Sequence, residues 1–532
     1  MNRIEVYDTT LRDGAQAEGI AFSVEDKRRI ALMLDEIGVA YIEGGWPNPK
    51  SPKDVEFFAL ARDLELRHAK LAAFGSTCRV GAPPEDDEQL RALLDSGAPV
   101  VTIFGKSWDL HVKEVLRCSR DENLRMIEES VAFLREAGRE VMFDAEHFFD
   151  GWRADPEYAL ETLRAVERGG ARMVVLCDTN GGSLPEQVRA AVRAAASTVK
   201  APLAIHVHND SGCAVANTIV AVEEGCVQVQ GTINGYGERC GNADLCVVVP
   251  TLVLKLGRNC LAARDGVRQL RHVSHAVAEM AMVEPDPRQP YVGNSAFAHK
   301  GGMHQDGMVK QTRTFEHIEP ESVGNDRRYV LSDMAGTAAV QMKLAKLFPH
   351  LTKRSPEVLE VLRRVKEMEN RGYEFEAAEA SFELLALDVM GKRPKLFEVT
   401  RLTVLVKETA RGVEEVFAEA ALQLQINGAG VSGVADGDGP VHALDNAVRQ
   451  ALGQRYPRLA NIRLTDFKVR VVSGKEGTAA KVRVVITSTD GHRSWTTVGA
   501  HENIIWASWL ALVDGYHYGL LMGEAGEVIP SC

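Results

Sequence analysis

Two histidines two positions apart, His206 and His208, are the residues whose types and spacing most suggest chemistry. In an extended strand successive side chains alternate between two faces, so both imidazoles point one way while Ile205 and Val207 point the other way. Two imidazoles and a carboxylate from elsewhere in the chain would form a first-row divalent metal site, and Asp13 is the expected carboxylate. A pair of hydrogen-bonded core histidines is the alternative that the spacing leaves open.

The loop that carries Asp13 follows the first strand-like run of the chain and reads Arg12, Asp13, Gly14. Gly14 permits a tight turn that would present Arg12 and Asp13 at the same edge as the two histidines. A carboxylate and two imidazoles leave coordination positions open for a chelating substrate. Asn242, which follows the last of the strands described below, is expected either to add a neutral oxygen ligand or to cap a helix.

Three more side chains are expected at this edge. In the fifth strand-like run Glu146 shares a face with Met142 and Asp144, so its carboxylate should point into the site and is not explained as packing. Thr179, after the sixth run, is expected to donate a hydrogen bond to a substrate carboxylate. Phe104, near the end of the fourth run, is bulky enough to narrow a pocket toward a small substrate.

The elements that must position these residues are β-rich runs that alternate with helical periodicity through about the first 260 residues. Eight β-α units in this length predict an α/β fold with a closed (β/α)8 TIM barrel as the catalytic domain, residues 1–265. Active sites of such barrels lie at the C-terminal ends of the strands, where the candidate residues fall. The runs are 4–10, 41–45, 70–76, 100–106, 140–148, 172–179, 203–209 and 227–234, and the clearest helices are 24–37, 122–137, 156–168, 185–199 and 242–256.

The rest of the chain divides into two further segments. Helical patterns dominate 266–394 and predict a mainly helical linker domain. It contains the segment HKGGMHQDG, 299–307, whose composition alone favours a loop between helices with incidental histidines. Residues 395–532 return to β-alternation in two loosely repeated β-α halves, which predict an α+β regulatory and dimerisation domain; a purely structural dimerisation cap is the alternative.

The composition excludes several classes of protein. The chain has 532 residues, of which 45% are hydrophobic and 26% charged, as in ordinary globular proteins. Its net charge of −12 argues against nucleic acid or an anionic membrane as the main partner. We expect a cytoplasmic protein, because no signal peptide precedes the first strand-like run and Pro250 interrupts the longest apolar stretch. Nine cysteines without a Cys-x-x-Cys pair fit reduced thiols.

Several motifs together resemble a known family. DTTLRDG, HVHND and the GxGERCGNAD stretch resemble the acyl-CoA-condensing, HMG-CoA-lyase-like superfamily of α-isopropylmalate, homocitrate and citramalate synthases. The longer strings DTTLRDGAQAEGIAFSVEDK, YIEGGWPNPKSPKD, FGKSWDLH, FDAEHFFDGW and LCDTNGG are similar to its long-form (R)-citramalate synthase group. The resemblance runs from the N-terminus into the C-terminal domain.

The resemblance implies an acyltransferase that condenses acetyl-CoA with pyruvate and then hydrolyses the thioester to give citramalate and CoA, for isoleucine biosynthesis. A 2-isopropylmalate or homocitrate synthase-type condensation with another 2-oxo acid, and a cleaving lyase, are alternative enzymes. A metal- and amino-acid-binding regulator without catalysis is the alternative from another class. The resemblance also implies a homodimer whose C-terminal domain takes an amino-acid effector, with isoleucine as the expected one.

The family also implies roles for the candidate residues. A divalent ion (Mg, Mn, Zn or Co) would be held by Asp13, His206, His208 and Asn242, while Arg12 would stabilise negative charge on the ketone oxygen and Glu146 and Thr179 would position the substrate. His304 and Asp306 match a motif whose histidine assists proton removal from the acetyl group and comes from the partner subunit. Related synthases carry a tyrosine shortly after a Ser-Gly-[Arg/Lys]-like stretch; residues 335–341 have none here, and whether Tyr329 or nothing replaces it is left open.

Overall fold

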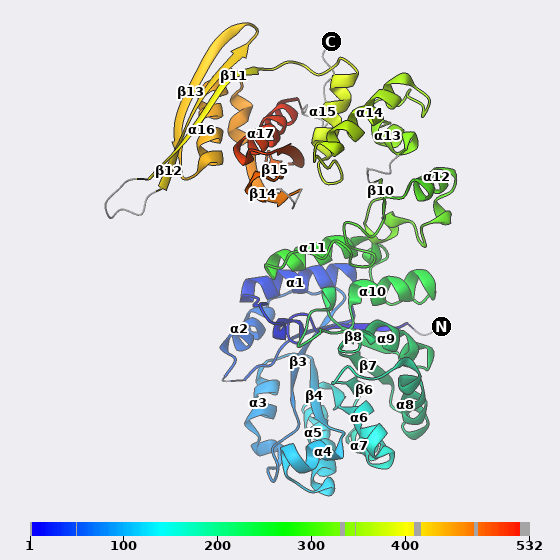
Figure 1. Ribbon diagram of the computed structural model, residues 1–532. Helices are drawn as coiled ribbons and strands as arrows, with labels where there is room; N and C mark the ends of the chain where they lie inside the picture. Colours follow the sequence, from blue (N-terminus) through cyan, green and yellow to red (C-terminus); the bar gives the residue numbers. More distant parts are fainter. Residues whose placement is uncertain are drawn as a thin grey trace. The chain divides into compact units, whose positions relative to one another are not determined.

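The computed structural model describes residues 3–48, 50–329, 336–345, 347–408, 416–472 and 477–521. It contains two compact units (Figure 1). The first consists of Met1–Phe297 with His317–Arg327, and the second of Ala298–Glu316 with Arg328–Cys532. Each unit is described by itself, and the predicted domain boundaries at 265 and 394 stay predictions.

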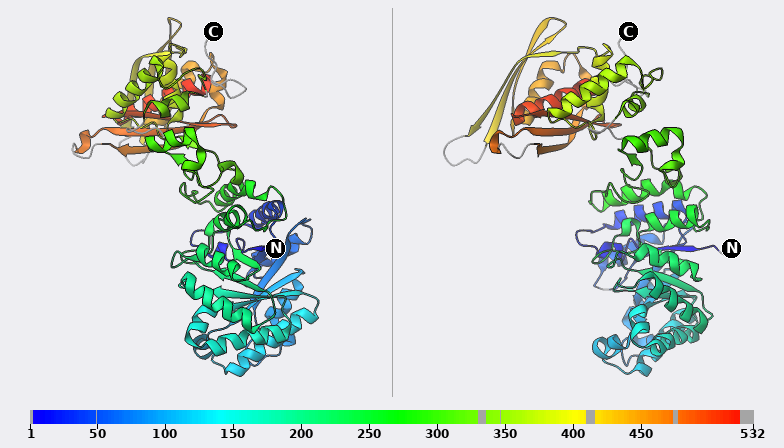
Figure 2. Two further views of the ribbon diagram at one scale, coloured as in Figure 1. Left: turned by 90° about the vertical axis from the view of Figure 1, so that its right-hand side faces the viewer. Right: turned by 45° about the vertical axis from the view of Figure 1, so that its right-hand side comes forward.

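The first unit is built around a closed barrel of parallel strands in which β8 pairs back to β1, so the predicted (β/α)8 barrel is confirmed (Figure 1). Figure 2 shows its helices on the outside of the strands. The strands are β1 (Glu5–Asp8), β2 (Tyr41–Gly45), β3 (Lys70–Ser76), β4 (Val100–Lys106), β5 (Glu140–Glu146), β6 (Met173–Asp178), β7 (Leu203–Val207) and β8 (Gln228–Gly231).

The helices of this unit follow the strands as the sequence predicted. The ends of the first helix, α1, are set by local residues. Ser23 and Asp26 form a capping box at its N-terminus. Gly38 ends it at φ 87°, a conformation that glycine adopts without strain. The helices are α1 (Val24–Ile37), α2 (Pro52–Ala61), α3 (Glu88–Asp95), α4 (Asp109–His111), α5 (Arg120–Glu136), α6 (Phe148–Ala154), α7 (Pro156–Gly169), α8 (Pro185–Thr198), α9 (Ala214–Glu223), α10 (Leu245–Pro250) and α11 (Leu270–Met280).

Five strands end earlier than the sequence predicted, at the edge where the candidate residues lie. The runs 4–10, 140–148, 172–179, 203–209 and 227–234 extend beyond the observed strands. At the end of β1 the Thr10 amide donates to the Asp8 carboxylate at 2.9 Å in place of a neighbouring strand. Local side-chain acceptors of this kind compete with the sheet ladder, so the chain turns into a loop.

The helix predicted over 242–256 begins later than expected. The observed α10 starts at Leu245 and continues as a π-helical turn, Thr251–Lys255. Its N-cap is Asp244, whose carboxylate accepts a hydrogen bond from the Cys246 amide at 2.8 Å. The alternative that Asn242 is the helix cap is therefore wrong.

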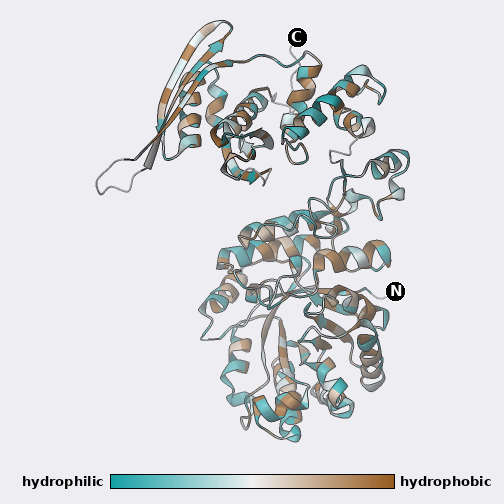
Figure 3. Ribbon diagram, viewed as in Figure 1, coloured by the Kyte–Doolittle hydropathy of each residue, from teal (hydrophilic) through white to brown (hydrophobic). Residues whose placement is uncertain are grey.

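The barrel buries apolar side chains in two layers, as strand alternation requires. Ile205 and Val207 belong to the layer between strands and helices, whereas Met142 lies in the smaller cluster inside the barrel. Figure 3 shows apolar and polar residues alternating around the surrounding helices. His206 and His208 are buried on the inner face, as predicted.

The second unit contains the C-terminal segment and part of the predicted linker, whereas α11 of that linker belongs to the first unit. Among the described residues, its C-terminal part holds two three-stranded antiparallel sheets, each followed by a helix. The elements are β9 (Ala298–His299), α12 (Gly302–Lys310), β10 (Arg328–Tyr329), α13 (Thr337–Leu344), α14 (Pro356–Asn370), α15 (Glu379–Val389), β11 (Glu398–Glu408), β12 (Val416–Ile426), β13 (Ala429–Gly437), α16 (Pro440–Leu452), β14 (Arg463–Val471), β15 (Val482–Thr489), β16 (Ser494–His501) and α17 (Ile504–Leu521).

The core of this unit joins α16 and α17 to the sheets, with Leu422, Leu444 and Ile486 fully or almost fully buried. Strand β14 behaves differently, because Leu464, Phe467 and further apolar side chains along it are exposed. Exposed apolar strands of this kind mark surfaces that associate. Among the described helices, none combines the length and hydropathy of a membrane span.

An ion-pair network ties the strand beginnings together at the end of the barrel opposite the candidate site. Arg172, before β6, contacts Glu5 of β1 at 2.5 Å and Glu140 of β5 at 2.8 Å. The Tyr41 hydroxyl of β2 donates to Glu140 at 2.7 Å. One guanidinium thus links strands that are distant in the sequence.

We expect Arg172→Ala to lower the free energy of unfolding by about 1–3 kcal/mol, because the half-buried Glu5 loses its cation and Glu140 keeps only Lys70. Urea unfolding followed by circular dichroism measures this loss. Arg164→Ala is the matched control, since Arg164 pairs with Glu161 on the exposed surface of α7 and should cost about 0.5 kcal/mol or less. Equal losses in the two variants would contradict the assignment.

Candidate functional site

Three of the predicted residues converge at the C-terminal end of the barrel. The Nε2 atoms of His206 and His208 lie 3.4 and 3.6 Å from Oδ2 of Asp13. Each side chain offers one ligand atom, and these atoms lie within 4.8 Å of one another. All three residues are buried, so the group is enclosed by the barrel and is not a surface cluster.

The unsatisfied polar atoms around this group fit a cation. Asp13 Oδ1, His206 Nδ1, His208 Nδ1 and Asn242 Oδ1 are buried and have no hydrogen-bond partner among the described residues. Unpaired buried polar atoms cost about 1–3 kcal/mol each, so they need an explanation such as a bound ion. Asn242 donates through Nδ2 to the Tyr236 carbonyl at 3.2 Å, and its backbone pairs with that of His208.

The protonation states of His208 and Asp13 suit the same role. Burial and the neighbouring His206 lower the pKa of His208 to about 4, so its imidazole is neutral at neutral pH. Burial alone would raise the pKa of Asp13, but Arg12 and His206 hold it well below its usual range. Neutral imidazole and ionised carboxylate are the forms that bind metals.

Arg12 is fixed beside this group by two contacts, one of them to a carboxylate that is itself held in place. Its Nε donates to Glu43 at 2.6 Å, and its guanidinium lies 3.7 Å from the centre of the Phe74 ring. The Tyr7 hydroxyl donates to the other oxygen of Glu43 at 2.8 Å, and Glu43 is fully buried. The Arg12 side chain therefore presents its remaining N–H groups in one orientation.

Seven of the predicted residues line one cavity of about 200 Å³, whereas Asn242 lines a neighbouring one. Three aromatic rings form part of its wall, with centres 5.5 to 5.7 Å apart: Trp46, Phe74 and Phe104. Glu146 is paired with Lys106, and Thr179 stands at the end of β6. The lining residues are Arg12, Asp13, Gln16, Trp46, Phe74, Phe104, Asp144, Glu146, Cys177, Thr179, His206, His208 and Glu238.

Some residues of this site were not predicted from the sequence. Glu43 and Lys106 could have been found, because each falls at the C-terminal end of a predicted strand. Trp46 and Phe74 carried no such signal, since an aromatic residue near a strand end reads as ordinary core. Their approach to Phe104 is a property of the closed barrel.

His304 and Asp306 lie in the second unit, on α12. The His304 ring stacks on Phe315, with ring centres 4.2 Å apart and planes 20° apart. Asp306 pairs with Lys310 at 2.6 Å. Tyr329 lies in β10, with its ring centre 6.4 Å from that of His299. The roles predicted for His304 and Asp306 stay predictions.

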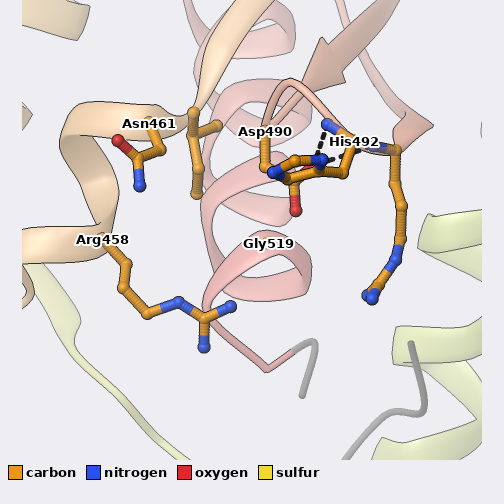
Figure 4. Close-up of a pocket in the computed structure, with 7 residues that line it drawn as sticks. Arg458, Asn461, Asp490, His492 and Gly519 are labelled. Atoms are coloured by element: carbon orange, nitrogen blue, oxygen red, sulfur yellow. Dashed lines mark hydrogen bonds between the residues drawn. The ribbon is translucent and has the colours of Figure 1, made fainter. Parts of the chain in front are cut away.

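A second cavity, of about 640 Å³, lies in the C-terminal half of the second unit (Figure 4). The turn between β15 and β16 forms one side, where Asp490 accepts hydrogen bonds from the His492 and Arg493 amides at 2.9 and 2.8 Å. The lining residues are Arg458, Asn461, Ile462, Asp490, His492, Arg493 and Gly519. This mainly polar lining suits a charged group better than an aliphatic chain.

Comparison with known families covers most of the chain. The HMGL-like family profile matches residues 3–277, the homocitrate synthase post-HMGL domain-like profile 291–373, and the LeuA allosteric (dimerisation) domain profile 376–520.

Full-length relatives show to which group of the family the chain belongs. The (R)-citramalate synthase of Geobacter sulfurreducens is 49% identical over 99% of both chains. That of Synechocystis sp. is 47% identical over 98% of this chain and 97% of the relative. A probable 2-isopropylmalate synthase of Methanopyrus kandleri is 33% identical over 97% of this chain and 98% of the relative. The chain therefore belongs to the HMGL-like family and, within it, to the group of the (R)-citramalate synthases.

Proposed function

We propose that this protein condenses acetyl-CoA with pyruvate and hydrolyses the resulting thioester, releasing (R)-citramalate and CoA for isoleucine biosynthesis. The observation that carries the proposal is the identity of 49% along 99% of the chain to a relative named for this product. The cavity described above supports it, because its charged residues and its size suit a small 2-oxo acid.

Asp13, His206, His208 and Asn242 are the residues that would hold a divalent cation, here proposed as Mg, Mn, Zn or Co. Such an ion would chelate the 2-oxo acid and polarise its ketone carbonyl as a Lewis acid. Arg12, held by Glu43, would stabilise the negative charge that develops on the ketone oxygen.

The proposal gives the remaining residues roles in positioning and proton transfer. Thr179 and Glu146 would orient the substrate, with Lys106 keeping Glu146 in place. His304 would remove the proton from the acetyl methyl group, work for which histidine is suited, and Asp306 would assist. The subunit that supplies His304 is proposed to be the partner in a homodimer.

The C-terminal domain is proposed to join two subunits and to bind isoleucine as an inhibitor. Its match to the LeuA allosteric (dimerisation) domain and the exposed apolar side chains of β14 support this. The polar cavity of Figure 4 is not the proposed isoleucine site, because an aliphatic side chain gains little there. Release of CoA measured with and without isoleucine reports whether the domain regulates turnover.

The competing function is condensation with 2-oxoisovalerate, as in the 2-isopropylmalate synthases. The aromatic wall of Trp46, Phe74 and Phe104 favours the smaller substrate. In a thiol-release assay with a panel of 2-oxo acids, we expect kcat/KM for pyruvate to exceed that for 2-oxoisovalerate by at least about 10-fold. This is the discrimination that one additional methylene group usually causes in an apolar pocket. A higher kcat/KM for 2-oxoisovalerate would replace the proposed substrate.

The metal site predicts a shared loss in three variants. We expect Asp13→Ala, His206→Ala and His208→Ala each to abolish turnover and bound divalent metal while the barrel stays folded, because each removes a ligand from a small set. Metal content per subunit and circular dichroism are measured on the purified proteins. His272→Ala, an exposed histidine on α11, is the matched control and should keep its metal. Undiminished metal content in a folded His208→Ala protein would show that these residues do not form the metal site.

The role of His304 predicts a loss in rate and its recovery in mixed dimers. His304→Ala should lower kcat by about 10²–10⁴-fold, the usual contribution of a general base, and change the KM for pyruvate far less. Dimers formed from His304→Ala and His206→Ala subunits should regain activity, since one of their two sites would be complete. Verified mixed dimers without activity would show that each site is built from one chain.

A further inference from the structure

The hydroxyl oxygen of Thr179 already accepts one hydrogen bond within the protein. It accepts a hydrogen bond from the backbone amide of His147 at 2.9 Å, and the Thr179 carbonyl accepts one from Arg239 at 2.7 Å. A threonine hydroxyl has a single hydrogen, and accepting a bond does not consume it. The hydrogen of Thr179 is therefore left to donate at the cavity that this residue lines.

The backbone of His147 adopts an uncommon conformation to make this contact. Its φ of 56° and ψ of 32° lie in the left-handed region, which few residues other than glycine adopt, although asparagine, aspartate and histidine are found there more often than the rest. Conformations of this kind persist only where the surroundings determine them, and they cluster at functional sites. Some feature of the fold must therefore hold His147 in place.

The ring of His147 is held on two sides. Its Nδ1 lies 3.3 Å from Asp150, whose carboxylate also accepts from Asn180 at 2.9 Å and Arg153 at 2.5 Å. The His111 ring packs against it with centres 4.2 Å apart, and the residue is 8% exposed. These contacts fix the side chain and, through it, the direction of the amide.

We propose that His147 is a positioning residue for the 2-oxo acid: its clamped ring holds the amide against Thr179, and this contact turns the Thr179 hydroxyl hydrogen toward the substrate carboxylate. The inference rests on the proposed function, since it needs a 2-oxo acid in the cavity. The carboxylate is common to all 2-oxo acids, so the inference does not depend on which one is bound.

The first test separates positioning from folding. His147→Ala loses the clamp and disfavours the left-handed backbone, so we expect the KM for pyruvate to rise about 10- to 100-fold, the worth of a hydrogen bond to a charged group. The KM for acetyl-CoA and the melting temperature should change much less. His147→Asn should recover most of the loss, because asparagine tolerates this backbone conformation. An unchanged KM for pyruvate in His147→Ala would overturn the proposal.

A double-mutant cycle tests whether His147 acts through Thr179. Thr179→Val keeps the shape and removes the hydroxyl, so His147→Ala should have little further effect on the KM for pyruvate in that background. Additive effects of the two substitutions would overturn the proposal. His272→Ala is the matched control. If wild-type protein prefers another 2-oxo acid, the pyruvate assignment fails, and the same cycle measured with that acid still decides the role of His147.

Discussion

One constraint governs the mouth of the barrel: a charged side chain removed from water must meet an opposite charge or give up its own. Arg12 and Glu43 satisfy it together, because Nε of Arg12 lies 2.6 Å from the fully buried carboxylate of Glu43. Lys106 and Glu146 form a second pair at the edge of the same cavity. Fixed charges can therefore face a substrate without the reorganisation that water would require.

In two other carboxyl groups burial shifts the balance toward the neutral form. Burial raises the pKa of Asp8 to about 7, although hydrogen bonds from Thr10 oppose the shift. Burial also raises the pKa of Asp144 to about 7, against the effect of His206. Asp13 differs from both, because nearby positive charge keeps it ionised. Asp13 thus keeps a negative charge where a cation would bind.

The sequence predicted the parts of this arrangement that depend on period and order. Alternation in a strand placed His206 and His208 on one face, and the strand ends located Glu146 and Thr179. Contacts between side chains of neighbouring strands were not predictable, because the hydrogen bond from Arg12 to Glu43 depends on the register of β1 against β2. Predicted strands were too long for a related reason: polar residues at their ends bond locally instead of joining the ladder.

The two ends of the barrel use arginine differently, and this decides how replaceable each one is. Arg172 makes half-exposed pairs with Glu5 and Glu140, which water screens and another cation could partly replace. Arg12 instead pairs with Glu43 through Nε, while its planar guanidinium lies 3.7 Å from the centre of the Phe74 ring. Lysine has no planar group that could make both contacts at once. The mouth of the barrel therefore requires an arginine at position 12, whereas at the opposite end only the positive charge of residue 172 is needed.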